Sequence, residues 1–243
     1  MQKPSIWKVQ NCNGAEYLVA LLQFLLVEFS HIFGSGTMFA EECVVFNDQE
    51  ADCPMLIINS TPVRIRLAQS SLSFFAQTIF QLSHELCHYA IRQHKVNKDF
   101  TLSWFEEIVC EAMSLYVLHW AAENWECCSL CKVNPNFATS IDSYLKNELA
   151  SVGSDEFQKC TSIDLLCQYE REHSTDRQTH RNERNRLFAE IVQAPEESVC
   201  FCDYSRYLND NNLSIDFEKW EKDDNRKIVK FLHTLQPYSL EKS

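Results

Sequence analysis

One stretch of this chain, residues 80–118, decides both its fold and its chemistry, and it reads FQLSHELCHYAIRQHKVNKDFTLSWFEEIVCEAMSLYVL. Its first part contains HELCH, in which His84 and His88 are four residues apart. In an α-helix this spacing places both imidazoles on one face, with Cβ atoms roughly 5–6 Å apart. One zinc ion can bridge two histidines arranged in this way.

The second part of the stretch supplies candidates for a third ligand. A catalytic zinc ion takes three protein ligands and leaves its fourth position to water, so two histidines are not enough. Glu107 lies on the next predicted helix, far enough along for the chain to turn and run back, and Glu106 is its weaker rival. Glu85, between the histidines, points toward the same pocket. It can take a proton from the bound water there, so we expect it to be the general base.

A competing interpretation treats HELCH as an ordinary amphipathic helix with surface histidines, because bare HExxH patterns also occur by chance. The residues before the motif argue against it. They are strongly apolar and predict a substantially buried helix: Phe74, Phe75, Ile79, Phe80 and Leu82. Buried histidines need polar partners. A metal satisfies two of them on one face more economically than unrelated hydrogen bonds do.

These residues resemble the gluzincins, a group that includes thermolysin and the zinc aminopeptidases. In the aminopeptidases, eighteen residues separate HExxH from a glutamate within a W-L-N-E segment, and Trp104 to Glu107 stand at that spacing here. The resemblance implies that Glu107 is the third ligand. It also implies that Glu111, four residues later, supports a ligand histidine, although a solvated helix carboxylate is the alternative.

The resemblance covers about forty residues, and two parts of the gluzincin pattern are not readable. No G-x-M-E-N segment, which binds the free amine of aminopeptidase substrates, precedes the motif, and MFAEE at residues 38–42 is only a loose echo. The exopeptidase assignment is therefore not supported. Tyr169, His173 and His180 are candidates for the residue that stabilises the oxyanion, but an ordinary structural role is the simpler interpretation of each.

Composition predicts a compact, mainly helical α+β enzyme. The 243 residues are 45% hydrophobic and include only 4 glycines and 6 prolines, which disfavours an all-β sandwich with its many tight turns. We expect one domain over residues 1–243, with a subdivision into a zinc-binding core (1–125) and a helical part (126–243) as the alternative. The net charge of −12 repels nucleic acid and anionic membranes and favours peptide or protein substrates.

The 12 cysteines raise the question of compartment and of a second metal site. The apolar run 18–27 is too short to span a bilayer and is not followed by a clear cleavage site, so we expect a buried helix and a cytoplasmic protein. Cys127, Cys128 and Cys131 together with Cys200 and Cys202 are candidates for a structural zinc site. That signal is weak because the two groups are far apart and irregularly spaced.

The remaining pattern predicts a helix over 15–33, broken by Gly34-Ser35-Gly36, and strands over 38–46, 55–59 and 63–67. We expect 63–67 to be either a plain sheet strand or an edge strand that binds substrate by strand addition. The active-site helix is expected to begin near Ser70 or Ser71. Further helices are predicted over residues 102–124, 136–150, 155–172, 177–193 and 215–235, with the charged stretch 170–186 as a solvated turn and helix face.

Together these patterns predict a gluzincin-like zinc metallopeptidase that cleaves peptide bonds with a zinc-activated water. Two alternatives remain open. One is a non-catalytic protein-binding module on a zincin scaffold, and the other is a zinc hydrolase of non-peptide substrates. A pure binding module would not need Glu85, so the presence of this residue favours the enzyme.

Overall fold

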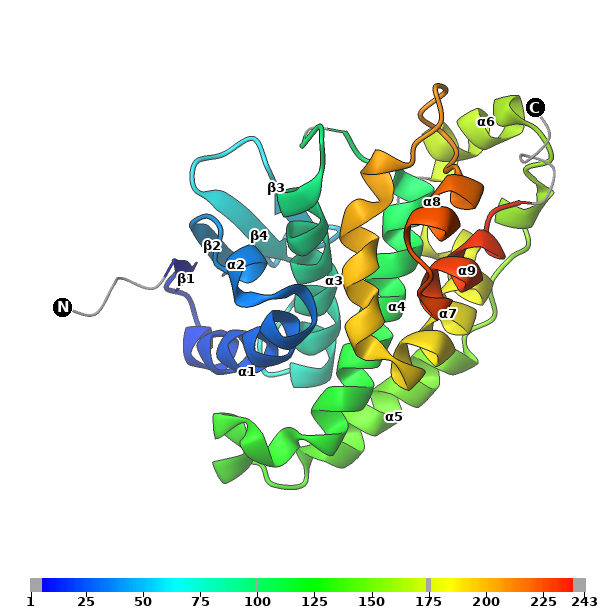
Figure 1. Cartoon of the computed structure of the whole chain (residues 1–243). Coiled ribbons are helices and arrows are strands. Elements are labelled where there is room, and N and C mark those ends of the chain that lie inside the picture. Colours follow the sequence, from blue (N-terminus) through cyan, green and yellow to red (C-terminus); the bar gives the residue numbers. More distant parts are fainter. Residues whose placement is uncertain (1–5, 99, 174–175, 238–243) are drawn as a thin grey trace. The chain divides into compact units, whose positions relative to one another are not determined.

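The computed structural model describes residues 6–98, 100–173 and 176–237 (Figure 1). The chain is an α+β protein, mainly helical, with a small mixed sheet. It divides into two compact units, each made of two segments: Met1–Gln93 with Ser114–Glu148, and His94–Met113 with Leu149–Ser243. The alternative subdivision at residue 125 thus falls inside the first unit.

The first unit contains the sheet and the most apolar helices. In chain order its elements are β1 (Trp7–Val9), α1 (Ala15–Phe33), α2 (Ser35–Met38), β2 (Cys43–Asn47), β3 (Met55–Ile57), β4 (Val63–Leu67), α3 (Phe75–His94), the second half of α4 (Ser103–Glu123), the 3₁₀ turns η1 (Trp125–Cys127) and η2 (Ser129–Lys132), and most of α5 (Phe137–Ala150).

The helix α1 has the bounds that its apolar pattern predicts. Gly34 ends it with φ 84°, a left-handed conformation that residues with a Cβ rarely adopt, and its N–H bonds to Ser30. This helix is long and apolar enough to cross a membrane, but 56% of that window is buried inside the protein. Its Glu28 is also buried and accepts a hydrogen bond from the Tyr116 hydroxyl of α4. Burial of this kind is typical of a core helix.

The sheet has the order β1-β2-β4-β3, with β1, β2 and β4 parallel and β3 antiparallel to β4. In β4 the residues Val63, Ile65 and Leu67 are buried and the two arginines between them are half-buried, as the alternating pattern predicts. The edge-strand interpretation of β4 is wrong, because β2 and β3 pair with its two sides. The short strand β3 forms the edge instead.

One further strand prediction needs correction, and one strand was not predicted. The predicted strand 38–46 begins only at Cys43, because Met38 belongs to the short helix α2, where its side chain is fully buried. The first strand, β1, has no counterpart in the predictions. It is only three residues long, and its pairing with β2 is long-range in sequence, so a local pattern could not reveal it.

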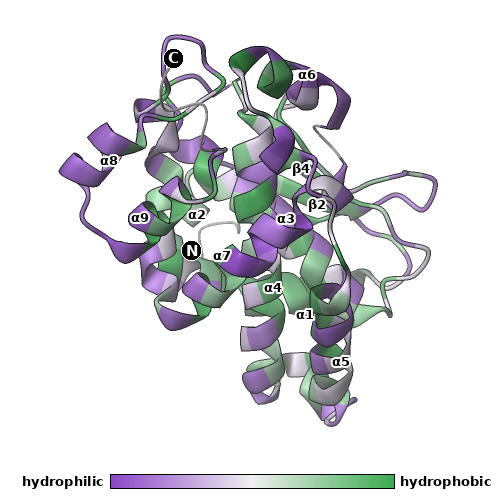
Figure 2. Ribbon diagram, turned by 90° about the vertical axis from the view of Figure 1, so that its right-hand side faces the viewer, coloured by the Kyte–Doolittle hydropathy of each residue, from purple (hydrophilic) through white to green (hydrophobic). Residues whose placement is uncertain are grey.

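The second unit is helical. It contains the first half of α4, then the 3₁₀ turn η3 (Phe157–Lys159), α6 (Ile163–His173), the 3₁₀ turn η4 (Arg177–His180), α7 (Arg181–Gln193), the 3₁₀ segment η5 (Pro195–Arg206), α8 (Phe217–Asp223) and α9 (Lys227–His233). The α8 ribbon is mostly hydrophilic (Figure 2). Only Phe217 and Trp220 of this helix are buried.

Several predicted helices are shorter or broken. The active-site helix starts at Phe75 rather than near Ser70 or Ser71, because Ser71 forms a turn with Ser73 and Phe74. The predicted helix 155–172 starts its α-helical part at Ile163. The predicted helix 215–235 divides into α8 and α9, since the Asp224 carboxylate accepts hydrogen bonds from Arg226 and turns the chain there.

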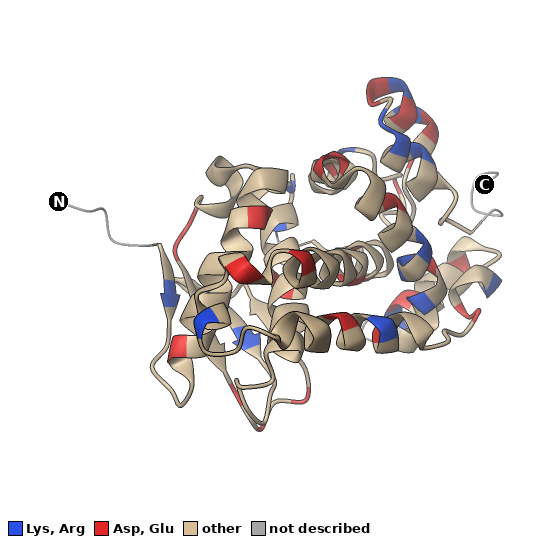
Figure 3. Ribbon diagram, turned by 90° about the horizontal axis from the view of Figure 1, so that it is seen from below, with Lys and Arg blue, Asp and Glu red and all other residues tan. Residues whose placement is uncertain are grey.

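The prediction of a solvated face over 170–186 is partly wrong. Thr179, His180, Glu183 and Arg184 are all at most 4% exposed. Arg184 donates a hydrogen bond to Glu111, 73 residues away, and Glu183 accepts one from Gln158, 25 residues away. Elsewhere acidic and basic residues are interspersed along the ribbon (Figure 3).

Candidate metal centre

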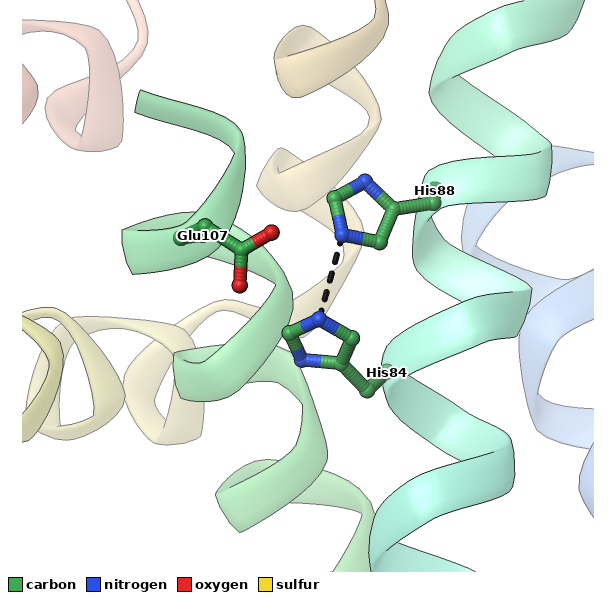
Figure 4. Close-up of side chains that lie close together, drawn as sticks. All are labelled: His84, His88 and Glu107. Carbon is green, nitrogen blue, oxygen red and sulfur yellow. Dashed lines mark hydrogen bonds between the residues drawn. The ribbon is translucent and has the colours of Figure 1, made fainter. Parts of the chain in front are cut away.

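The helix α3 carries the first three candidate residues. His84 and Glu85 are each 3% exposed, and His88 is half-buried. The Nε2 atoms of the two histidines are 3.1 Å apart and their rings are tilted toward each other (Figure 4). Two nitrogens that bind one tetrahedral zinc ion at about 2.0–2.1 Å are roughly 3.3 Å apart, so the spacing fits a shared ion.

Glu107 completes the group. Its carboxylate and the two imidazoles offer one ligand atom each, and these atoms all lie within 4.8 Å of one another (Figure 4). Among residues 6–98, 100–173 and 176–237, no other group of three or more histidines, cysteines or acidic residues lies so close. Two nitrogens and one carboxylate oxygen form a donor set that suits zinc and other divalent transition metals. The donors present therefore fit such an ion.

Glu106, the weaker rival for the third ligand position, has other partners. Its Oε1 forms an ion pair with Lys95 and accepts a hydrogen bond from the Tyr204 hydroxyl. The side chains of Lys95 and Glu106 are 3% and 2% exposed. Burial and the neighbouring Glu106 carboxylate raise the pKa of the Tyr204 phenol, so it remains a donor. These contacts favour Glu107 over Glu106 as ligand.

Glu111 is fully buried on α4, one turn after Glu107. Its Oε2 accepts a hydrogen bond from Arg184 Nη1 at 2.9 Å and lies 3.8 Å from Nε2 of His180. A buried carboxylate is costly to keep ionised unless it is paired, and Arg184, itself 1% exposed, supplies the opposite charge. The solvated-carboxylate alternative is therefore wrong. Its support of a ligand histidine stays a prediction.

The three candidates for oxyanion stabilisation differ in their surroundings. The hydroxyl of Tyr169 is 2.7 Å from that of Thr179, and burial raises the pKa of the phenol. His173 lies 3.5 Å from Asp176 and its side chain is 31% exposed. His180 is 1% exposed and lies beside Glu111. Glu111 is on the same helix as Glu107. Of the three, only His180 thus has a described contact with a candidate site residue.

The segment 38–42, which only loosely resembles an amine-binding segment, has a definite structural role. The carboxylate of Glu41 meets Arg92 and accepts a hydrogen bond from Gln93 at 2.7 Å. The Glu41 carbonyl accepts a hydrogen bond from the Tyr89 hydroxyl at 3.0 Å. All three partners lie at the end of α3, so these contacts tie the segment after α2 to the ligand helix.

Within residues 6–98, 100–173 and 176–237, the five cysteines proposed for a second metal form no group of three or more that could hold an ion. Burial raises the pKa of both the Cys128 and the Cys200 thiols.

Three residues that the sequence did not single out complete the surroundings of the candidate ligands. Lys95, Arg184 and Tyr204 are buried and carry hydrogen bonds or charges. They lie in no motif. Tyr204 is 98 residues from Glu106, and Arg184 is 73 residues from Glu111. Arg184 lies in the charged stretch 170–186, and nothing in the sequence marked it, Lys95 or Tyr204 as buried.

The comparisons with known proteins add no relative. No protein-family model, no curated protein and no solved structure matches this chain. The likeness to gluzincins therefore depends on the motif residues and their spacing.

Proposed function

We propose that this chain is a zinc-dependent hydrolase, most simply a metallopeptidase of gluzincin type. The observation that supports the proposal best is the convergence of His84, His88 and Glu107 within 4.8 Å. A buried glutamate, Glu85, stands between the two histidines in the sequence. This combination supplies three ligands and a base, which are the parts that hydrolysis of an amide by activated water requires.

His84, His88 and Glu107 hold the zinc ion in this proposal. When bound there, zinc supplies a Lewis acid that acidifies water and polarises the amide carbonyl. Glu85 accepts a proton as the water oxygen bonds to the carbonyl carbon. The same carboxylate passes this proton to the amide nitrogen as the C–N bond breaks, so that the products are a carboxylic acid and an amine.

His180 is our candidate for the donor that stabilises the negative charge on the carbonyl oxygen. Its Nε2 lies 3.8 Å from the Glu111 carboxylate, which is also paired with Arg184. A positioned donor aimed at a developing oxyanion typically contributes 10²–10³-fold in kcat. Tyr169 is less suited to the role because its hydroxyl is shared with Thr179.

Metal analysis of purified wild type and variants tests the proposal. The wild type should contain about one zinc per chain, and His84→Ala and Glu107→Ala should lose it. Cleavage of a broad peptide library should require the metal and be abolished by a chelator. A wild type without zinc, or zinc content unchanged in both ligand variants, would overturn the metal centre. Zinc binding without cleavage would leave the binding-module alternative.

A further inference from the structure

The residue next to the proposed third ligand has an unusual setting within the second unit. Glu106 Oε1 meets both Lys95 Nζ and the Tyr204 hydroxyl, and each of the three side chains is almost completely buried. Lys95 lies directly after the end of α3, and Tyr204 belongs to η5. The Glu106 carboxylate of α4 thus connects the segment that follows α3 with η5, whose Tyr204 is 98 residues further along the chain.

Other hydrogen bonds extend this network to the segment that precedes α4. Lys95 Nζ donates to the Thr101 hydroxyl at 3.2 Å, and the N–H of Leu102 donates to the Tyr204 hydroxyl at 3.3 Å. The N–H of Glu106 bonds to the Leu102 carbonyl at 3.0 Å. The first turn of α4, which begins at Ser103, is therefore held both by backbone hydrogen bonds and by the contacts of the Glu106 side chain.

This anchoring matters for Glu107 because helix ends tend to fray, and Glu107 is only the fifth residue of α4. Successive residues on an α-helix are about 100° apart around its axis. Holding the Glu106 side chain toward Lys95 and Tyr204 therefore sets the direction in which Glu107 points. The same contacts also occupy Glu106, which would otherwise compete with its neighbour for a cation.

Stability alone is a poor explanation for the network. A buried ion pair is weak evidence for stability, because well-packed apolar residues of similar volume often serve equally well or better. We propose that Lys95 and Tyr204 are positioning residues for the metal centre, which hold Glu106 and thereby orient the first turn of α4 so that Glu107 meets the ion. This inference depends on the proposed zinc site.

Zinc affinity of Tyr204→Phe tests the inference, with Tyr169→Phe as the matched control. Each change removes one buried phenol hydroxyl from the second unit, but only the first hydroxyl reaches Glu106. Affinity is measured by competition with a chromogenic chelator, and folding of the metal-free proteins by circular dichroism and thermal unfolding. We expect Tyr204→Phe to weaken zinc binding by about 10–100-fold, as loss of a group that orients a ligand typically does. Tyr169→Phe should bind as the wild type does.

The paired change Lys95→Met with Glu106→Met provides a second route, because it removes both charges and leaves neither buried alone. It should also weaken zinc binding while the protein stays folded. Wild-type affinity in folded Tyr204→Phe and in the folded pair would overturn the positioning role, and so would equal weakening by Tyr169→Phe. Unfolding of both network variants would show a folding requirement and overturn it as well. A wild type that binds no zinc would overturn the proposed function itself.

Discussion

The two helices that carry the candidate ligands are specified in different ways. On α3 the chemistry is local, because His84, Glu85 and His88 lie within five residues. Helical periodicity places both imidazoles on one face, with their Nε2 atoms 3.1 Å apart. On α4 it is not local. Glu106 and Glu111 are held by Tyr204 and Arg184, which lie 98 and 73 residues away.

This difference separates what a motif encodes from what the fold must add. A motif such as HELCH carries its own geometry, since four residues make about one helical turn. A lone glutamate on a second helix carries none. Its neighbours on α4, Glu106 and Glu111, contact buried residues from other parts of the chain. Lys95 and Tyr204 meet Glu106, and Arg184 and His180 lie beside Glu111.

The largest expected effect tests the local half of the comparison. Glu85→Gln should keep the fold and the zinc but reduce kcat by at least about 10²–10⁴-fold, because the amide cannot accept the proton of the water. The measurement is single-substrate peptide kinetics with metal content determined on the same samples. Glu123→Gln, an exposed change on α4, is the control and should leave kcat unchanged. Full activity in Glu85→Gln would contradict the role of the base.

The next effect tests the non-local half. Arg184→Met leaves the Glu111 carboxylate buried with its main counter-charge removed, and should lower the free energy of unfolding by about 3–5 kcal/mol. Chemical denaturation measures it. Arg186→Met, an exposed change on the same helix, is the control. A loss no larger than that of the control would show that the buried pair does not matter for stability.

The sequence predicted the local features well. The bounds of α1 and β4 are as predicted, and the two helices that carry the candidate ligands were placed to within a few residues. In each case strong apolar periodicity or a short motif determines the structure through residues close in the chain. The same is true of the HELCH geometry.

The features that could not be predicted depend on tertiary contacts. A single arginine in a charged stretch gives no sign that it will be buried, yet Arg184 is 1% exposed and paired with Glu111. The strand β1 needs the partner β2, which lies more than thirty residues away. The break between α8 and α9 depends on one aspartate side chain that bonds to Arg226, a change too local to disturb the apolar pattern around it.

A third prediction concerns the pH dependence of stability and the carboxylate of Glu183, the residue before Arg184 in the sequence. Burial raises the pKa of Glu183, only partly offset by the hydrogen bond from Gln158. A raised pKa in the folded state contributes stability that is present below the ordinary carboxyl pKa, about 4.3, and is lost as pH rises through the higher folded value. Glu183→Gln avoids this loss.

The advantage of Glu183→Gln over the wild type in unfolding free energy should therefore increase from pH 4 upward until the folded-state pKa is passed, and then level off. Denaturant titrations over a pH series measure it, with the highly exposed Glu218→Gln as the control. An advantage that falls with rising pH would have the wrong sign and would contradict a raised pKa.

The smallest effect compares the cores of the two units. Burial raises the pKa of Cys43 in the first unit to about 12 and that of Cys200 in the second well above its ordinary range. At pH 8 iodoacetamide should therefore modify the exposed Cys53 and Cys127 and leave both buried thiols intact until the protein unfolds. Mass spectrometry of the peptides identifies the sites. Early labelling of Cys200 alone would indicate that the second unit opens more readily.

The most direct test of the central claim is to locate zinc by its anomalous X-ray scattering in crystals of the purified protein. We predict a single strong peak in contact with Nε2 of His84, Nε2 of His88 and the carboxylate of Glu107, with Glu85 beside it. A peak at any other cluster, or no peak in protein supplied with zinc, would contradict the proposed metal centre.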